Sequence, residues 1–117
     1  MSSDALVLRK HAGSVDLRAD VAHLGRDLLV SIVGGEAHIG AVALGGFNKR
    51  SYASVIAVPD HRDDVIAKEA ALRISKELQR TCVVIVGIHV NNASEQQISQ
   101  AVESSMELVN ELIEAFK

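Results

Sequence analysis

The feature that most limits how this chain can fold is an apolar run in its last third, Cys82 to Val90, which is rich in valine and isoleucine. Its longest uninterrupted part, Cys82 to Ile88, has seven residues, whereas a helix that crosses a membrane needs roughly 20. A short β-branched run of this kind is typical of a central strand that is covered on both faces. We therefore expect this segment to lie inside a sheet.

Helical patterns flank the apolar run on both sides. The first pattern begins near Asp60 and ends around Arg80, with apolar residues recurring at helical spacing. The second begins at Ser94, which together with Gln97 matches the capping-box pattern of a helix N-terminus. Its apolar stripe continues to Phe116 at core spacing, so we interpret that aromatic residue as part of the packing.

The first sixty residues have the pattern of strands. The segment from Val15 to Val21 alternates strictly between apolar and polar residues, which is typical of a strand with one wet face. The other expected strands are Ala5 to His11, Leu28 to Val33, His38 to Leu44 and Ser54 to Val58. Glycine-containing turns separate the first four strands, and Gly45 to Ser51 is expected to be a longer loop. This order predicts an antiparallel meander.

Five strands, a helix, a strand and a helix predict an α+β fold. We expect a mostly antiparallel six-stranded sheet with two helices on one face, and an opposite face that meets water or a second subunit. With 117 residues, folding buries roughly 65% of the surface of the unfolded chain, so one domain over residues 1–117 is expected. The lone Cys82 has no disulfide partner, and we interpret it as a small buried hydrophobic residue.

Composition argues against several classes of function. The net charge is −3, no basic run exceeds Lys49-Arg50, and the aromatic residues are two Phe and one Tyr, so a nucleic-acid binder is not expected. The first residues lack the basic segment and long apolar segment of a signal peptide, which predicts a cytoplasmic protein. The sequence has no nucleophile elbow, catalytic triad or phosphate loop, so we do not expect an independent enzyme.

The expected topology brings three histidines to one end of the sheet. If the fourth and fifth strands form a hairpin, a crossover through the first helix places the end of the apolar strand at the same end. His38, His61 and His89 then share one rim with the Gly34-Gly35 turn. The N-termini of both helices also lie there, and their amides suit a phosphate or a carboxylate. The Lys49-Arg50 pair is expected at the opposite rim.

Other residues of this rim have more than one interpretation. Asn91 and Asn92 can shape a turn and cap the second helix, or can hold the polar edge of a ring. Three aspartates, Asp60, Asp63 and Asp64, would repel an anion from the first helix, which favours the second helix as the anion site. Three imidazoles can also ligate zinc, although no pair has the i,i+4 spacing of a helical zinc motif. His11 and His23 are expected at the surface.

Three segments resemble a known family. His38 to Leu44, Pro59 to Asp64 and Gly87 to Ser94 look like the matching segments of the small D subunit of gallate-type hydroxyaryl decarboxylases, the LpdD-like domain. The resemblance covers nearly the whole chain in order and spacing, and its H-I-G-A-V-A and G-I-H-x-x-N-A motifs are fairly specific together. Family members often have Asp where this chain has Asn91. The domain is also similar to proteasome assembly chaperones, which are dimers of this α+β type.

The resemblance implies a chaperone that binds reduced prenylated flavin mononucleotide (FMN) and delivers it to the large subunit of a UbiD-type non-oxidative hydroxyaryl decarboxylase. A flavin prenyltransferase would make this cofactor, and the chaperone would be a homodimer. The implied flavin site lies on the same rim and consists of His38, Gly40, His61, His89, Asn91, Asn92 and Ser94. In it, Gly40 allows close approach of the flavin and the amides near Ser94 receive the phosphate.

Two alternatives remain open. The chain could be a cofactor-free assembly factor for a decarboxylase complex, or it could hold a metal ion through its three rim histidines. The scarcity of aromatic residues favours a carrier over an enzyme that keeps its flavin, because little stacking would hold a planar ring.

Overall fold

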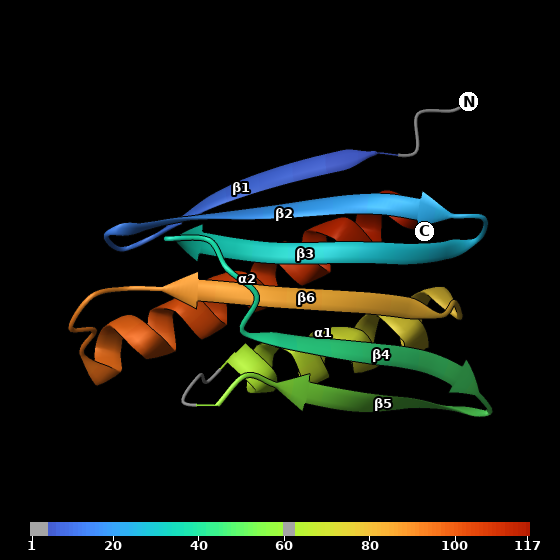
Figure 1. The fold of residues 1–117 in the computed structure, drawn as a ribbon. Coiled ribbons are helices and arrows are strands. Elements are labelled where there is room, and N and C mark those ends of the chain that lie inside the picture. Colours follow the sequence, from blue (N-terminus) through green and yellow to red (C-terminus); the bar gives the residue numbers. More distant parts are fainter. Residues whose placement is uncertain (1–4, 60–62) are drawn as a thin grey trace.

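The computed structural model describes residues 5–59 and 63–117, and over these ranges the chain forms six strands and two helices (Figure 1). The elements are β1 (Leu6–Ala12), β2 (Val15–Leu24), β3 (Asp27–Gly35), β4 (Ala41–Asn48), β5 (Arg50–Ala57), α1 (Asp63–Leu78), β6 (Cys82–His89) and α2 (Glu95–Phe116). The strands form one mostly antiparallel sheet, and both helices pack on the same face of it (Figure 1). The predicted α+β fold is confirmed.

The order of the strands corrects one prediction. The sheet runs β1-β2-β3-β6-β4-β5, so β6 lies between β3 and β4, and the first four strands do not form a simple meander. β6 pairs parallel to β3, with Leu28 beside Cys82, and antiparallel to β4, with Ala41 beside Val86. The most apolar strand takes an inner position because both of its edges can then be hydrogen-bonded. That part of the prediction, an inner strand at Cys82, is confirmed.

The loop expected at Gly45 to Ser51 was also wrong. β4 and β5 continue through it and turn tightly at Lys49, whose φ is 69°. Gly45 and Gly46 are packing glycines, because a Cβ at Gly45 would lie 2.6 Å from the Ala71 carbonyl oxygen and one at Gly46 would collide with the ring of Tyr52. Glycine marks turns and close packing alike, so its presence alone did not predict a loop.

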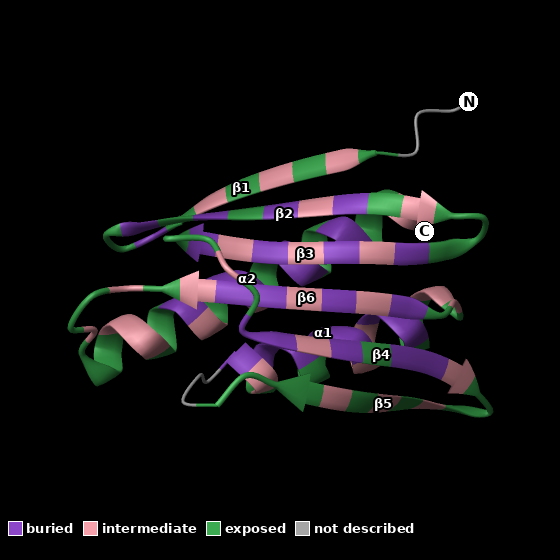
Figure 2. Ribbon diagram, viewed as in Figure 1, coloured by how far each residue is buried: buried purple, intermediate pink, exposed green. Residues whose placement is uncertain are grey.

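The core lies between the sheet and the two helices (Figure 2). Its largest fully buried side chains include Leu17, Leu28, Ile32, Ile74, Leu108 and Leu112. Phe116 packs against this core, as its spacing predicted. The Cys82 thiol is buried, and desolvation raises its pKa to about 11.

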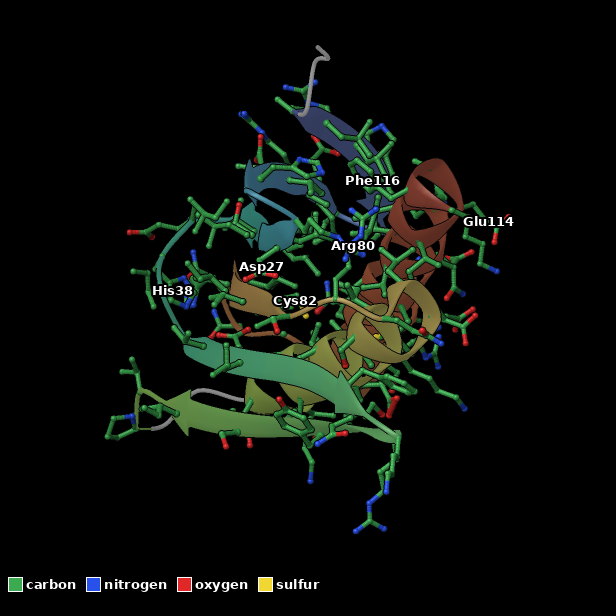
Figure 3. All side chains as sticks on the ribbon, turned by 90° about the vertical axis from the view of Figure 1, so that its right-hand side faces the viewer. Asp27, His38, Arg80, Cys82, Glu114 and Phe116 are labelled. Atoms are coloured by element: carbon green, nitrogen blue, oxygen red, sulfur yellow. The ribbon has the colours of Figure 1, made fainter. Side chains whose placement is uncertain are left out.

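No described helix or strand of the same chain covers the other face of the sheet, which only the segment between β3 and β4 crosses, near the end of β6 (Figures 1 and 3). Val83 and Ile85 of β6 are only half-buried there. Leu44 on β4 is 49% exposed, and Tyr52 and Ile56 on β5 are 53% and 80% exposed. We call this surface the open face. We expected β6 to be covered on both faces. Within a single chain, the two helices cover only one of them (Figure 1).

Candidate functional site

The candidate site lies at the rim where β3 and β6 end side by side. Gly35 pairs with His89 there, and residues 36–40 then cross over β6 to reach β4 (Figure 1). This crossing segment lies very close to β6, because a Cβ at Gly87 would collide with the His38 carbonyl oxygen. The end of β3 is also close to β6, because a Cβ at Gly35 would collide with the His89 carbonyl oxygen. His38 is therefore placed by the crossing segment, three residues before β4 begins at Ala41, and not by the strand that was expected to begin with it.

The structure brings His38, His89 and Asn91 together. The two imidazole rings have centroids 6.3 Å apart at an interplanar angle of 80°. His38 Nδ1 donates to the carbonyl oxygen of Glu36 at 3.0 Å, and His89 Nε2 donates to Oδ1 of Asn91 at 2.9 Å. Because both of these oxygens only accept hydrogen bonds, the nitrogen that carries the proton in each bond is Nδ1 in His38 and Nε2 in His89. The Asn91 amide oxygen accepts this bond as a carboxylate oxygen would.

Asp63 belongs to the same cluster, and the sequence did not reveal it as more than a repulsive charge. It begins α1 and is 5% exposed. Its Oδ1 accepts from the backbone N–H of Ile88 at 3.2 Å, and its Oδ2 lies 3.5 Å from His38 Nε2. On the edge of β6 that faces β4, the Gly40 N–H donates to the carbonyl oxygen of Val86. Two residues further along β6, the N–H of Ile88 also needs an acceptor, and Asp63 supplies it.

Gly40 makes room for this carboxylate. A Cβ at position 40 would collide with Oδ2 of Asp63 and would lie 3.1 Å from the Val86 carbonyl oxygen. The close approach that glycine permits here is thus an approach of Asp63. A contact between Gly40 and a flavin stays a prediction.

The turn after β6 contains Asn92, which was expected to shape a turn, and Ser94, which was expected to cap α2. Asn92 has a φ of 54°, a left-handed conformation that Asn tolerates better than most residues. Ser94 caps α2 in the predicted capping box: its Oγ accepts from Gln97 N at 3.1 Å, and Gln97 Oε1 accepts from Ser94 N at 2.8 Å. Two of the amides expected to receive a phosphate are therefore bonded within the chain.

His89 lines two cavities. One, of about 260 Å³, lies between the start of α1, the end of β6 and the start of α2, and we call it the helix-side cavity. The other, of about 340 Å³, is lined by Glu36, His38, Ile39 and His89, and we call it the rim cleft. Pockets for whole small molecules and cofactors span roughly 300–1,000 Å³. The rim cleft lies at the lower end of this range, and the helix-side cavity lies below it.

Comparison with known proteins bears on this site. A family model described as the prenylated flavin chaperone LpdD-like domain matches residues 11–117. This chain belongs to that family. It is 29% identical over 103 residues to Protein LpdD of Lactiplantibacillus plantarum, a match that covers 83% of this chain and 74% of that protein.

The fold of this LpdD-like chain also occurs outside the family. A solved structure described as a novel chaperone complex for yeast 20S proteasome assembly superimposes with a TM-score of 0.63, at 13% identity, over 98% of this chain and 100% of that one. At this identity the likeness concerns the fold alone.

The remaining sequence predictions for the LpdD-like chain can now be placed. Lys49-Arg50 lies at the opposite end of the sheet from His38, as expected, because β4 passes the start of β6 before it reaches the turn. His61 lies outside the described residues. Within 5–59 and 63–117, no three His, Cys, Asp or Glu side chains are grouped to hold a metal ion, and no helix is long and apolar enough to cross a membrane.

Proposed function

We propose that this LpdD-like chain binds reduced prenylated FMN and delivers it to a UbiD-type hydroxyaryl decarboxylase. The observation that carries the proposal is the convergence of His38, His89 and Asn91 at a rim cleft, in a chain of the prenylated flavin chaperone family. Imidazole and amide groups offer both donors and acceptors, which the dioxo edge of a flavin ring requires. Gly40, His61, Asn92 and the amides near Ser94 complete the proposed site.

The composition of the two cavities supports a carrier. None of the described residues that line them is Phe, Tyr or Trp. A flavin bound there is held by hydrogen bonds and aliphatic contacts without stacking on a large aromatic ring, which is worth about 1–3 kcal/mol per base-sized ring. Weaker retention suits a protein that must release its cargo to a decarboxylase.

We further propose that the chain is a homodimer that pairs through its open face. β6 is apolar on both faces, but the helices of the same chain cover only one of them. Half-buried Val83 and Ile85, together with exposed Leu44, Tyr52 and Ile56, present an apolar surface across three adjacent strands. A second copy would cover it, since a two-fold dimer places the same patch on both sides of the interface.

Anaerobic co-expression with a flavin prenyltransferase tests the proposed cargo. The purified chain is expected to carry the absorbance of a reduced prenylated flavin and no stoichiometric metal. A colourless, metal-free protein that cannot take up the flavin would contradict the proposal and favour the cofactor-free assembly factor. Metal at one ion per chain without flavin would instead favour the metal-binding alternative.

Delivery has its own test. The loaded chain is mixed anaerobically with a UbiD-type decarboxylase that lacks cofactor, and the two proteins are separated by size. We expect the flavin absorbance to move to the decarboxylase and its activity to appear. Flavin that stays on the small chain would contradict the carrier role while leaving the binding site intact.

A further inference from the structure

The helix-side cavity differs from the rim cleft in the chemistry of its lining. Its walls are mostly aliphatic, from Ile66, Ile88, Val90, Ile98, Ala101 and Val102. The polar residues that line it are Asp63, His89 and Gln97. At about 260 Å³ it is smaller than the pockets that hold whole cofactors, so it fits only part of such a ligand.

The polar and aliphatic residues of this cavity are arranged along its depth. Asp63 begins α1, His89 ends β6 and Gln97 lies in the first turn of α2, so all three lie at the rim. Ile66 lies about one turn further along α1, and Ala101 about one turn further along α2. The cavity therefore has a mouth that holds all of its polar residues, beside Val90 and Ile98, and an interior that is only aliphatic.

A second observation points to a ligand at the mouth. The Asp63 side chain is more than nine-tenths buried and borders the cavity. No described residue donates a hydrogen bond to its Oδ2, and His38 Nε2 lies 3.5 Å from it. Since buried carboxylate oxygens are normally satisfied, this carboxylate keeps an acceptor beside Gly40 and His38, at the border of the cavity, that a polar group of a ligand would satisfy.

We propose that the helix-side cavity receives the prenyl-bearing hydrocarbon end of the flavin, while the rim cleft takes the polar edge. This inference rests on the proposed function, and it assigns the part of the site that distinguishes prenylated from ordinary FMN. Because each buried methylene contributes about 0.8 kcal/mol, the five-carbon prenyl group is expected to improve binding by at least about tenfold. His89, which lines both cavities, contacts the ring between its two ends.

The test compares two ligands on three proteins. Reduced prenylated FMN and reduced FMN are titrated anaerobically into the wild type, Ala101→Leu and Ala115→Leu, and flavin absorbance is followed. Ala101 is buried at the cavity wall, so the added carbons of Leu fill the interior. Ala115 is exposed on the same helix, which makes it the matched control. We expect Ala101→Leu to lose the preference for prenylated FMN and Ala115→Leu to keep it.

The outcomes separate this inference from the proposed function. Wild-type protein that binds neither flavin would contradict the carrier role itself. Wild-type protein that binds both flavins equally, or a folded Ala101→Leu that keeps the preference, would overturn the cavity assignment and leave the carrier role standing. If Ala101→Leu does not fold, Val102→Thr places a hydroxyl in the interior at nearly unchanged volume and is expected to lower the preference about threefold. An unchanged preference in Val102→Thr would overturn the assignment equally.

Discussion

At the scale of single residues, Gly40 and Asp63 form a matched pair. Glycine at position 40 leaves the space in which the buried carboxylate accepts from Ile88 and approaches His38. We expect Gly40→Ala to lower the free energy of unfolding by about 2 kcal/mol, a typical cost of overpacking. In an Asp63→Ala background the same change should cost less than half as much, because its main collision partner is gone. Urea denaturation of the four proteins measures this coupling, and equal costs in both backgrounds would contradict it.

Cys82 yields a prediction about pH. Burial raises its pKa from 9.0 to about 11, so the folded chain keeps the thiol protonated where the unfolded chain has begun to lose the proton. Between these two values the folded state binds more protons, and the contribution of Cys82 to stability falls as the pH rises through this window. Iodoacetamide at pH 9 should therefore label the native chain at least about tenfold more slowly than the chain in urea. Similar labelling rates would contradict the buried, protonated thiol.

The residue scale also shows what the sequence could and could not predict about the site. His38, His89 and Asn91 were expected on one rim because strand direction alone determines which ends meet. Asp63 was interpreted only as a charge that repels anions, because an acidic residue in the first turn of a helix is usually solvated. Its burial depends on Ile88, 25 residues away, and on the gap that Gly40 leaves. No local pattern encodes that arrangement.

At the scale of elements, local signals predicted the helices well and the strand neighbours less well. The capping box at Ser94 and the apolar stripe to Phe116 are properties of contiguous residues, and the structure confirms both. The insertion of β6 between β3 and β4 could not be predicted from local sequence, because the backbone of any strand can pair with that of any other. The Gly45-Gly46 pair was misinterpreted as a loop. Glycine is needed there because the Ala71 backbone and the Tyr52 ring, from other elements, pack closely against these two residues.

The capping box provides a test at this scale. Ser94→Ala removes the oxygen that accepts from Gln97 N, and we expect it to lower the free energy of unfolding by about 1 kcal/mol. The control is Ser99→Ala, an exposed position within α2, where alanine should be neutral or slightly stabilising because of its higher helix propensity. Urea denaturation compares the two variants. Equal effects would mean that the box does not stabilise the start of the helix.

At the scale of the whole molecule, the open face predicts self-association. Light scattering should give twice the 12.5 kDa mass of one chain. Ile56→Lys, on the open face, should shift the protein to monomer, because it places a charge in an apolar interface. Val65→Lys makes the same change at an exposed valine of α1 and should leave the dimer intact. A monomeric wild type, or equal effects of the two variants, would contradict pairing through this face.

The central claim is that the rim around His89 holds the flavin, and a direct titration tests it most simply. Reduced prenylated FMN is added anaerobically to the wild type, to His89→Ala and to His23→Ala, a histidine of β2 that lines neither cavity. We expect the wild type to saturate at one flavin per chain, His89→Ala to bind at least about tenfold more weakly, and His23→Ala to bind within about twofold of the wild type. A folded His89→Ala protein that binds the flavin as tightly as the wild type would contradict the site.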